Sequence, residues 1–126
     1  MQKKSYNIVI VGGGSTWTPG ILKALTKHQD KLSLKKVVLY DIDEKRQGTI
    51  GEFGKILFKE EYPEAEFSYT TNKEEAYKDV DFVFCQMRTG GYPMREKDEH
   101  IPLSMGIIGQ ETCGPGGFAY GIRSIK

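Results

Sequence analysis

A run of glycines followed by two hydroxyl residues is the part of the chain best suited to hold a charged ligand. The segment Gly12–Thr16 (GGGST) follows directly on the apolar run Tyr6–Val11. Glycines let a backbone approach a pyrophosphate closely, and the start of a following helix offers free N–H groups and the positive end of its dipole. The pattern therefore predicts a dinucleotide-binding loop, with a tight turn that binds nothing as the alternative.

An acidic residue after the second apolar run supports this prediction. Asp41 follows Leu34–Tyr40 and is placed to accept hydrogen bonds from an adenosine ribose, which favours NAD over NADP. The fingerprint is incomplete, because Trp17 stands where the third glycine is expected and the interval from Gly12 to Asp41 exceeds the usual ~20 residues. No Lys-Ser/Thr pair follows the glycines, which excludes a P-loop. Arg46 is expected to face solvent from the next helix.

Three charged residues are further candidates in the last third of the chain. Arg95 could form a forked contact with phosphate or with vicinal hydroxyls, although residues 94–100 also have the composition of a solvated helix face. Arg88 is expected to end the last strand, at the edge where ligands of parallel sheets bind. Glu111 lies in the glycine-rich segment 109–121, predicted to be a loop, where it could orient a base, bind a sugar or cap a helix.

The other reactive side chains are isolated from one another. Cys85 and Cys113 fit neither a metal-ligand pattern nor a disulfide framework, so a reducing cytoplasm is the expected environment. Cys113 also has no His or Asp close in sequence, which argues against a nucleophile. We expect the two histidines to lie on the surface and two aromatic residues to be packed rather than to line a site: His28, His100, Trp17 and Tyr120.

Composition excludes several classes of function. The chain has 126 residues with 18 basic and 17 acidic side chains, a net charge of +1 and 38% hydrophobic residues. It therefore reads as one globular domain without the basic excess that nucleic acid requires. Its longest apolar run, Ile8–Val11, is too short to span a membrane.

The elements that must position these residues alternate between strands and helices. Alternation of this kind predicts a Rossmann-like, doubly wound parallel sheet with right-handed crossovers. Residues 1–87 are interpreted as a βαβαβαβ dinucleotide-binding core, and residues 88–126 as a substrate-site loop with the start of a further helix. The glycines at positions 48, 51 and 54 predict either close packing or a frayed helix. The expected strands are Tyr6–Val11, Leu34–Tyr40, Glu66–Tyr69 and Val80–Cys85, and the expected helix N-caps are Thr18, Asp43 and Asn72.

Two longer blocks of residues make the sequence resemble a known protein family. They are residues 94–99 (MREKDE) and residues 109–117 (GQETCGPGG), joined by the GGGST start and by residues 69–72 (YTTN) and 79–83 (DVDFV). With these blocks the chain resembles the amino-terminal part of glycoside hydrolase family 4, the NAD- and metal-dependent 6-phosphoglycosidases. The QETC block, followed by AYG-x-RS, is similar to the 6-phospho-α-glucosidase branch, whereas the β-glucoside branch more often has Asn at the position of Cys113.

The resemblance implies hydrolysis through oxidation at sugar C3, elimination at C1, addition of water and re-reduction. It implies NAD and a divalent metal, Mn²⁺, as cofactors and a phosphorylated disaccharide as substrate. For the full-length enzyme we expect a homo-oligomer, and the composition argues against a nucleic-acid or membrane partner. Residues that match the family's NAD site are Gly12, Gly14, Ser15, Thr16 and Asp41, while Arg95 matches its substrate-binding arginine and Glu111 the acid that makes a base tyrosine more basic.

The family's metal ligands, proton donor and base tyrosine match no residue of this chain. The resemblance therefore implies a chain truncated before the catalytic and metal-binding domain and inactive by itself. The alternatives are a 6-phospho-β-glucosidase of the same family, a free-standing NAD-binding remnant without hydrolase activity and, more distantly, a dehydrogenase of the lactate/malate type.

Overall fold

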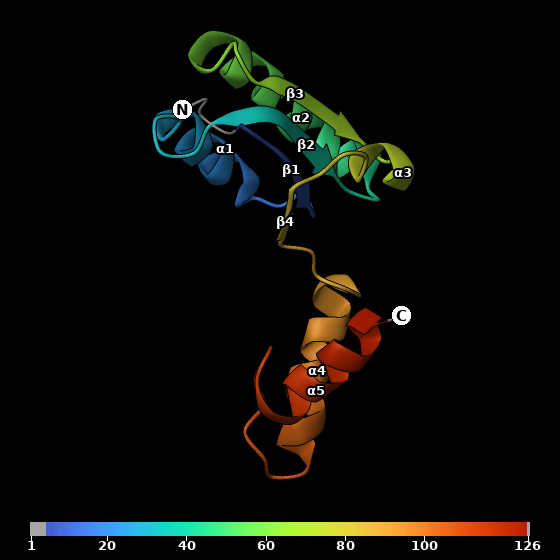
Figure 1. The fold of residues 1–126 in the computed structure, drawn as a ribbon. Coiled ribbons are helices and arrows are strands. Elements are labelled where there is room, and N and C mark those ends of the chain that lie inside the picture. Colours follow the sequence, from blue (N-terminus) through green and yellow to red (C-terminus); the bar gives the residue numbers. More distant parts are fainter. Residues whose placement is uncertain (1–4, 126) are drawn as a thin grey trace. The chain divides into compact units, whose positions relative to one another are not determined.

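Four parallel strands form one sheet in the order β3-β2-β1-β4 (Figure 1). The computed structural model describes residues 5–125. This strand order is that of the first half of a Rossmann-like sheet, so the predicted doubly wound parallel fold is confirmed. The elements are β1 (Tyr6–Val11), α1 (Thr18–Lys27), β2 (Leu34–Tyr40), α2 (Glu44–Glu61), β3 (Glu66–Thr70), α3 (Lys73–Ala76) and β4 (Phe82–Cys85).

Strand β1 is the centre of the sheet and its residues 8–11 are buried. A continuous run of β-branched residues suits this position, because the strand lies between two neighbouring strands and its side chains are buried on both faces of the sheet. Strand β4 lies at the edge, and all four of its residues are exposed. It begins at Phe82, two residues later than the predicted Val80.

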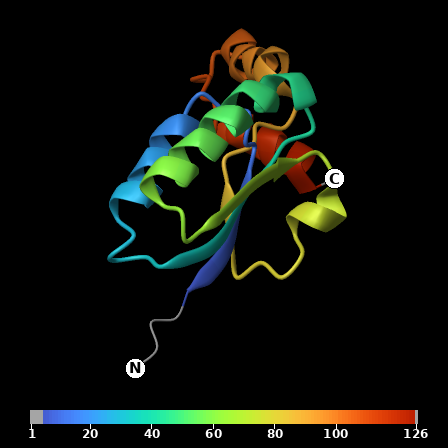
Figure 2. The ribbon, with the colours of Figure 1, turned by 90° about the horizontal axis from the view of Figure 1, so that it is seen from above.

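The helices cover the two faces of the sheet unequally. Helices α1 and α2 lie side by side on one face (Figure 2), where Leu22 and Phe58 pack against Ile8 and Leu39. On the other face, Ala76 of α3 belongs to a smaller cluster with the alternate residues of β1 and β2. Successive strand residues point to opposite faces, so β1 supplies both clusters.

Two glycines of α2 let the helix backbone approach β3. A Cβ at Gly51 would lie 2.5 Å from Cγ of Tyr69, and one at Gly54 would lie 2.6 Å from Cε1 of Phe67. Such distances leave no room for a methyl group, so the close-packing interpretation of this glycine face is confirmed at both positions. At Gly48 an added Cβ would meet no atom of the described residues within 4 Å.

The caps of α2 and α3 are the predicted ones, but the start of α1 differs. Asp43 and Asn72 accept hydrogen bonds from the backbone N–H groups of Arg46 and Glu75. The prediction that Thr18 caps α1 is wrong: Trp17 is the N-cap residue, and its side chain makes no capping hydrogen bond.

The chain divides into two compact units, of which the second begins at Arg88 and consists of α4 (Gly91–Ser104) and α5 (Gly114–Ile125). The segment 109–121, predicted to be a loop, is helical from Gly114 onward, so the prediction is wrong for residues 114–121. Gly90, with φ +85°, is the left-handed N-cap residue of α4. A Cβ at Gly116 would lie 2.7 Å from the Asp98 carbonyl oxygen, so this glycine lets α5 pack tightly on α4.

No helix within residues 5–125 is both long enough and apolar enough to cross a lipid bilayer.

Candidate functional site

Asp41 holds the glycine loop that follows β1. Its Oδ2 accepts a hydrogen bond from the Gly14 N–H at 2.8 Å, and its Oδ1 accepts one from the Asp43 N–H at 3.1 Å. A Cβ at Gly14 would lie 2.9 Å from that same Oδ2. The acid at the end of β2 is therefore part of the loop's own structure, and a side chain at Gly14 would push the two apart.

Arg46 lies over the loop rather than pointing away from it. Its Nε donates to the Gly14 carbonyl oxygen at 2.8 Å, so the expectation that Arg46 faces solvent is wrong for the guanidinium, although the residue as a whole is exposed. The backbone N–H of the same residue donates to the Asp43 cap, so Arg46 lies in the first turn of α2, beside the loop.

The first two glycines of the loop are each required by a neighbour. Gly12 has φ +85°, which favours glycine, and a Cβ there would lie 2.9 Å from the Met87 backbone nitrogen. A Cβ at Gly13 would lie 2.8 Å from the Leu39 Cβ. Both glycine N–H groups donate to the Tyr40 carbonyl oxygen, at 2.8 and 3.0 Å. The loop backbone is thus packed directly against the ends of β2 and β4.

The donors left open lie after the glycines. The Ser15 N–H donates to the Gly12 carbonyl oxygen, but no hydrogen bond within residues 5–125 uses the Thr16 N–H. Helix α1 starts two residues later without a side-chain cap. The Thr18 N–H donates to the Ser15 carbonyl oxygen and Pro19 has no N–H, so the open donor that could meet an anion such as a pyrophosphate is the Thr16 N–H, just before the helix. Trp17 is 79% exposed beside it, so the expectation that Trp17 is packed is wrong.

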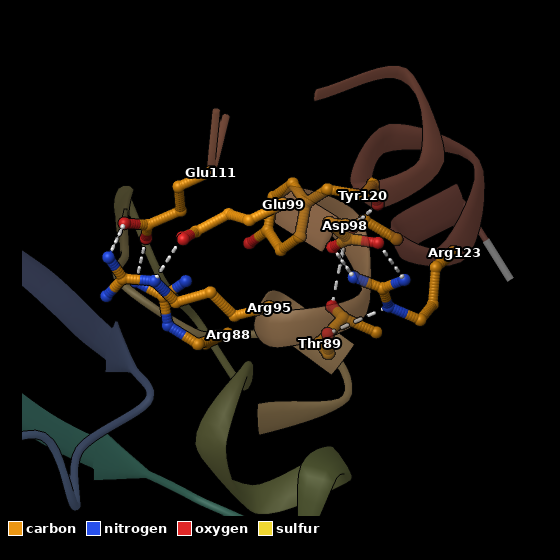
Figure 3. A network of polar contacts seen from close by, with 9 residues as sticks. Arg88, Thr89, Arg95, Asp98, Glu99, Glu111, Tyr120 and Arg123 are labelled. Carbon is orange, nitrogen blue, oxygen red and sulfur yellow. Dashed lines mark hydrogen bonds and ion pairs between the residues drawn. The ribbon is translucent and has the colours of Figure 1, made fainter. Parts of the chain in front are cut away.

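A chain of alternating charges dominates the second unit (Figure 3). Nη2 of Arg88 forms an ion pair with Oε1 of Glu111, and Nη2 of Arg95 lies 3.1 Å from Oε2 of the same carboxylate. Arg95 Nε also donates to Glu99 Oε1 at 2.7 Å, and this bond raises the pKa of the guanidinium. The structure therefore brings three sequence candidates together. Arg88 does not end β4, which stops at Cys85, but belongs to the second unit.

A second ion pair joins α4 to α5 and was missed by the sequence analysis. Asp98, 4% exposed at its side chain, accepts two hydrogen bonds from Arg123, at 3.1 Å to Oδ1 and 2.5 Å to Oδ2. The hydrogen bond from Arg123 holds the pKa of Asp98 below its usual value, against the opposing effect of burial. Arg123 Nε also donates to the Thr89 carbonyl oxygen at 3.0 Å, next to Arg88. Nothing in the spacing of these residues signals the pairing.

The described residues offer no metal site. Within residues 5–125 no three His, Cys, Asp or Glu side chains gather closely enough to hold a metal ion. Cys85 and Cys113 are both free and exposed, and the two histidines are exposed as expected. Tyr120, expected to be packed, is half-buried, with its ring centroid 5.7 Å from Cζ of Arg123.

Known proteins are similar to this chain in sequence and in fold. A model of the family 4 glycosyl hydrolases matches residues 7–126. The maltose-6'-phosphate glucosidase of Fusobacterium mortiferum is 55% identical over 122 residues, covering 97% of this chain and 28% of that protein. The 6-phospho-beta-glucosidase BglT of Thermotoga maritima is 39% identical over 118 residues, covering 94% of this chain and 28% of that protein.

The likeness extends to solved structures. A crystal structure of a 6-phospho-alpha-glucosidase from gut microorganisms, in complex with NAD and Mn²⁺, matches with a TM-score of 0.88 at 64% identity. The match covers 96% of this chain and 28% of the solved one. The chain thus spans 28% of the length of the curated relatives described above.

Proposed function

We propose, from the premise that this chain belongs to family 4 of the glycosyl hydrolases, that it forms the NAD-binding part of a 6-phospho-α-glucosidase. The enzyme would hydrolyse phosphorylated α-glucosides. The observation that carries the cofactor half of this proposal is the glycine loop closed by Asp41, with the Thr16 N–H left open just before α1. The α-linkage is favoured because the α-glucosidase relative is 55% identical and the β-glucosidase relative 39%.

The first unit would hold NAD through its own backbone and one carboxylate. The Thr16 N–H and the start of α1 would bind the pyrophosphate, and the remaining lone pairs of Asp41 would accept hydrogen bonds from the adenosine ribose. NAD, when bound, supplies an acceptor for hydride from the sugar and returns it later. The residues assigned to this site are Gly12, Gly14, Ser15, Thr16 and Asp41.

The second unit would contact the sugar and the proton-transfer machinery. We assign Arg95 to the substrate, whose phosphate or vicinal hydroxyls a planar guanidinium recognises with two parallel hydrogen bonds. Glu111 would lie beside a tyrosine base outside this chain, where its negative charge would make the phenol more basic. The described residues hold no group of side chains that fits a metal ion.

Further parts of the proposal concern the whole enzyme. We assign it to the cytoplasm, because its sugar substrates would be phosphorylated during uptake, and we expect it to be a homo-oligomer. Isolated residues 1–126 should not hydrolyse these substrates, since the family's proton donor, base and metal ligands match no residue of this chain. Metal-dependent hydrolysis by the chain alone would contradict this division of roles.

Two hybrid enzymes test the proposal. In one, this chain replaces the matching 28% of the Fusobacterium mortiferum glucosidase; in the other, it replaces the matching 28% of BglT. Each is assayed with NAD, Mn²⁺ and the chromogenic 6-phosphoglucoside of its own linkage. We expect the α hybrid to be active and the β hybrid to be impaired. The reverse result would indicate a 6-phospho-β-glucosidase, and two inactive hybrids that bind NAD would indicate a free-standing remnant.

A further inference from the structure

Arg88 contacts the carboxylate that the proposed function places beside the base. The ion pair joins Arg88 Nη2 to Glu111 Oε1, while Arg95 takes the other oxygen, Oε2, at 3.1 Å (Figure 3). The side chains of Arg88 and Glu111 are 34% and 28% exposed, so the pair is partly shielded from water. An ion pair at each oxygen restrains the direction in which the carboxylate points.

Of the two arginines that contact Glu111, Arg95 also binds a second carboxylate. Its Nε is engaged by Glu99 at 2.7 Å, so one guanidinium serves two carboxylates. Under the proposed function a substrate phosphate or hydroxyl would compete with Glu111 for the N–H groups of Arg95. Oε2 of Glu111 would then lose its partner, and Oε1 would keep the contact with Arg88.

Helix α5 holds Thr89, the residue that follows Arg88. The Thr89 carbonyl oxygen accepts from Arg123 Nε at 3.0 Å, and Ser124 Oγ lies 3.2 Å from Thr89 Oγ1. The guanidinium of Arg88 also lies over the Tyr92 ring, with Cζ 5.8 Å from its centroid. The backbone next to Arg88 and its guanidinium are therefore both restrained, the first by α5 and the second by Tyr92.

We infer that Arg88 is a positioning residue for Glu111, keeping this carboxylate in place when Arg95 turns to the substrate. The inference rests on the proposed function, because only there does Glu111 serve a base. It assigns Arg88 no contact with the substrate. Loss of Arg88 should therefore lower kcat and leave KM unchanged, whereas loss of Arg95 should raise KM.

A double-mutant cycle in the α hybrid tests the inference. Misplacement of a catalytic group by about 1 Å can lower a rate by a factor of roughly 10², so we expect Arg88→Gln to lower kcat by roughly 10- to 100-fold. Arg88→Lys, which keeps the charge, should restore part of the loss. In the background of Glu111→Gln, Arg88→Gln should have no further effect, because residues that act through one contact are not additive. Full additivity, or a raised KM with unchanged kcat, would overturn the inference.

A matched control removes a positive charge from α4, the helix that follows Arg88 in the chain. Lys97 lies on α4 and is exposed, and Lys97→Gln should leave kcat and KM unchanged. A loss as large as that of Arg88→Gln would show a general charge effect and overturn the inference.

The 126-residue chain itself provides a readout that does not depend on hydrolysis. The carboxyl ¹³C signal of Glu111, assigned by its absence in Glu111→Gln, should move in Arg88→Gln and stay in place in Lys97→Gln. A signal that does not move in Arg88→Gln would overturn the inference. An inactive unsubstituted α hybrid would instead contradict the proposed function, so the two failures are distinguishable.

Discussion

The glycines of α2 allow packing and helix propensity to be measured against each other in one helix. Gly48→Ala should stabilise the first unit by about 1 kcal/mol, because alanine forms helix better than glycine and the added methyl group meets nothing within 4 Å. Gly51→Ala gains the same propensity, but its methyl group would lie 2.5 Å from Cγ of Tyr69.

The Tyr69 ring cannot easily move out of the way. Its hydroxyl donates to Glu52 Oε1 at 2.6 Å, and Lys55 Nζ lies 4.7 Å from the ring centroid. Overpacking of this kind typically costs about 1–3 kcal/mol. Because both variants share the propensity gain, this overpacking energy is the expected difference between them, with Gly51→Ala the less stable.

Urea unfolding of the whole chain, followed by the amide NMR signals of β1, measures the difference within the first unit. The urea midpoint should rise for Gly48→Ala. The midpoint of Gly51→Ala should lie below that of Gly48→Ala, and at unchanged slope the two free energies of unfolding should differ by about 1–3 kcal/mol. Equal midpoints would contradict the close approach of α2 to β3. A lowered midpoint for Gly48→Ala would contradict the open space at that position.

Three further predictions concern other parts of the chain. The lowered pKa of Asp98 means that its pairing with Arg123 stabilises the second unit above the unfolded pKa of about 3.9, and that this stability is lost as the pH falls through the folded value. Thermal melts of the α4 and α5 signals should therefore depend on pH below about 4, and Asp98→Asn should remove that dependence; an unchanged profile in the variant would contradict the assignment. Tyr62→Phe should lower the free energy of unfolding of the first unit by about 1–3 kcal/mol, because the buried Leu34 N–H loses its hydrogen bond to the Tyr62 hydroxyl, 2.8 Å away. An unaltered midpoint in urea unfolding would show that this hydrogen bond is not needed. Gly14→Ala should weaken NAD binding in calorimetry, because the new Cβ would lie 2.9 Å from Asp41 Oδ2, and Gly20→Ala, where no described atom lies within 4 Å, is the control that should bind like the unsubstituted chain.

Local patterns predicted the sheet well because its strands are continuous apolar runs ended by distinct residues. Tyr6–Val11 stops at three glycines, and Leu34–Tyr40 stops at Asp41, so both strands have the predicted bounds. The spacing of Asp43 before a helical pattern likewise predicted the α2 cap. Each of these features is decided by residues close together in sequence.

The misses depend on contacts between distant residues. The G-P-G-G start of α5 has loop composition, but Gly116 becomes helical where its lack of a side chain lets α5 pack on the Asp98 backbone. Arg46 donates to the Gly14 carbonyl oxygen, a contact between residues 32 positions apart that local patterns do not indicate. The pairing of Arg123 with Asp98 has no sequence signal at all, since propensity and periodicity say nothing about which charges meet.

Titration of NAD into the 126-residue chain, measured by calorimetry, tests the central claim most directly. The loop closed by Asp41 predicts binding of one NAD per chain, tighter than NADP, and weakened by Asp41→Asn. Tighter binding of NADP would contradict the role given to Asp41. No binding by a chain whose β1 amide signals show it to be folded would contradict the assignment of residues 1–126 as the cofactor-binding part of the enzyme.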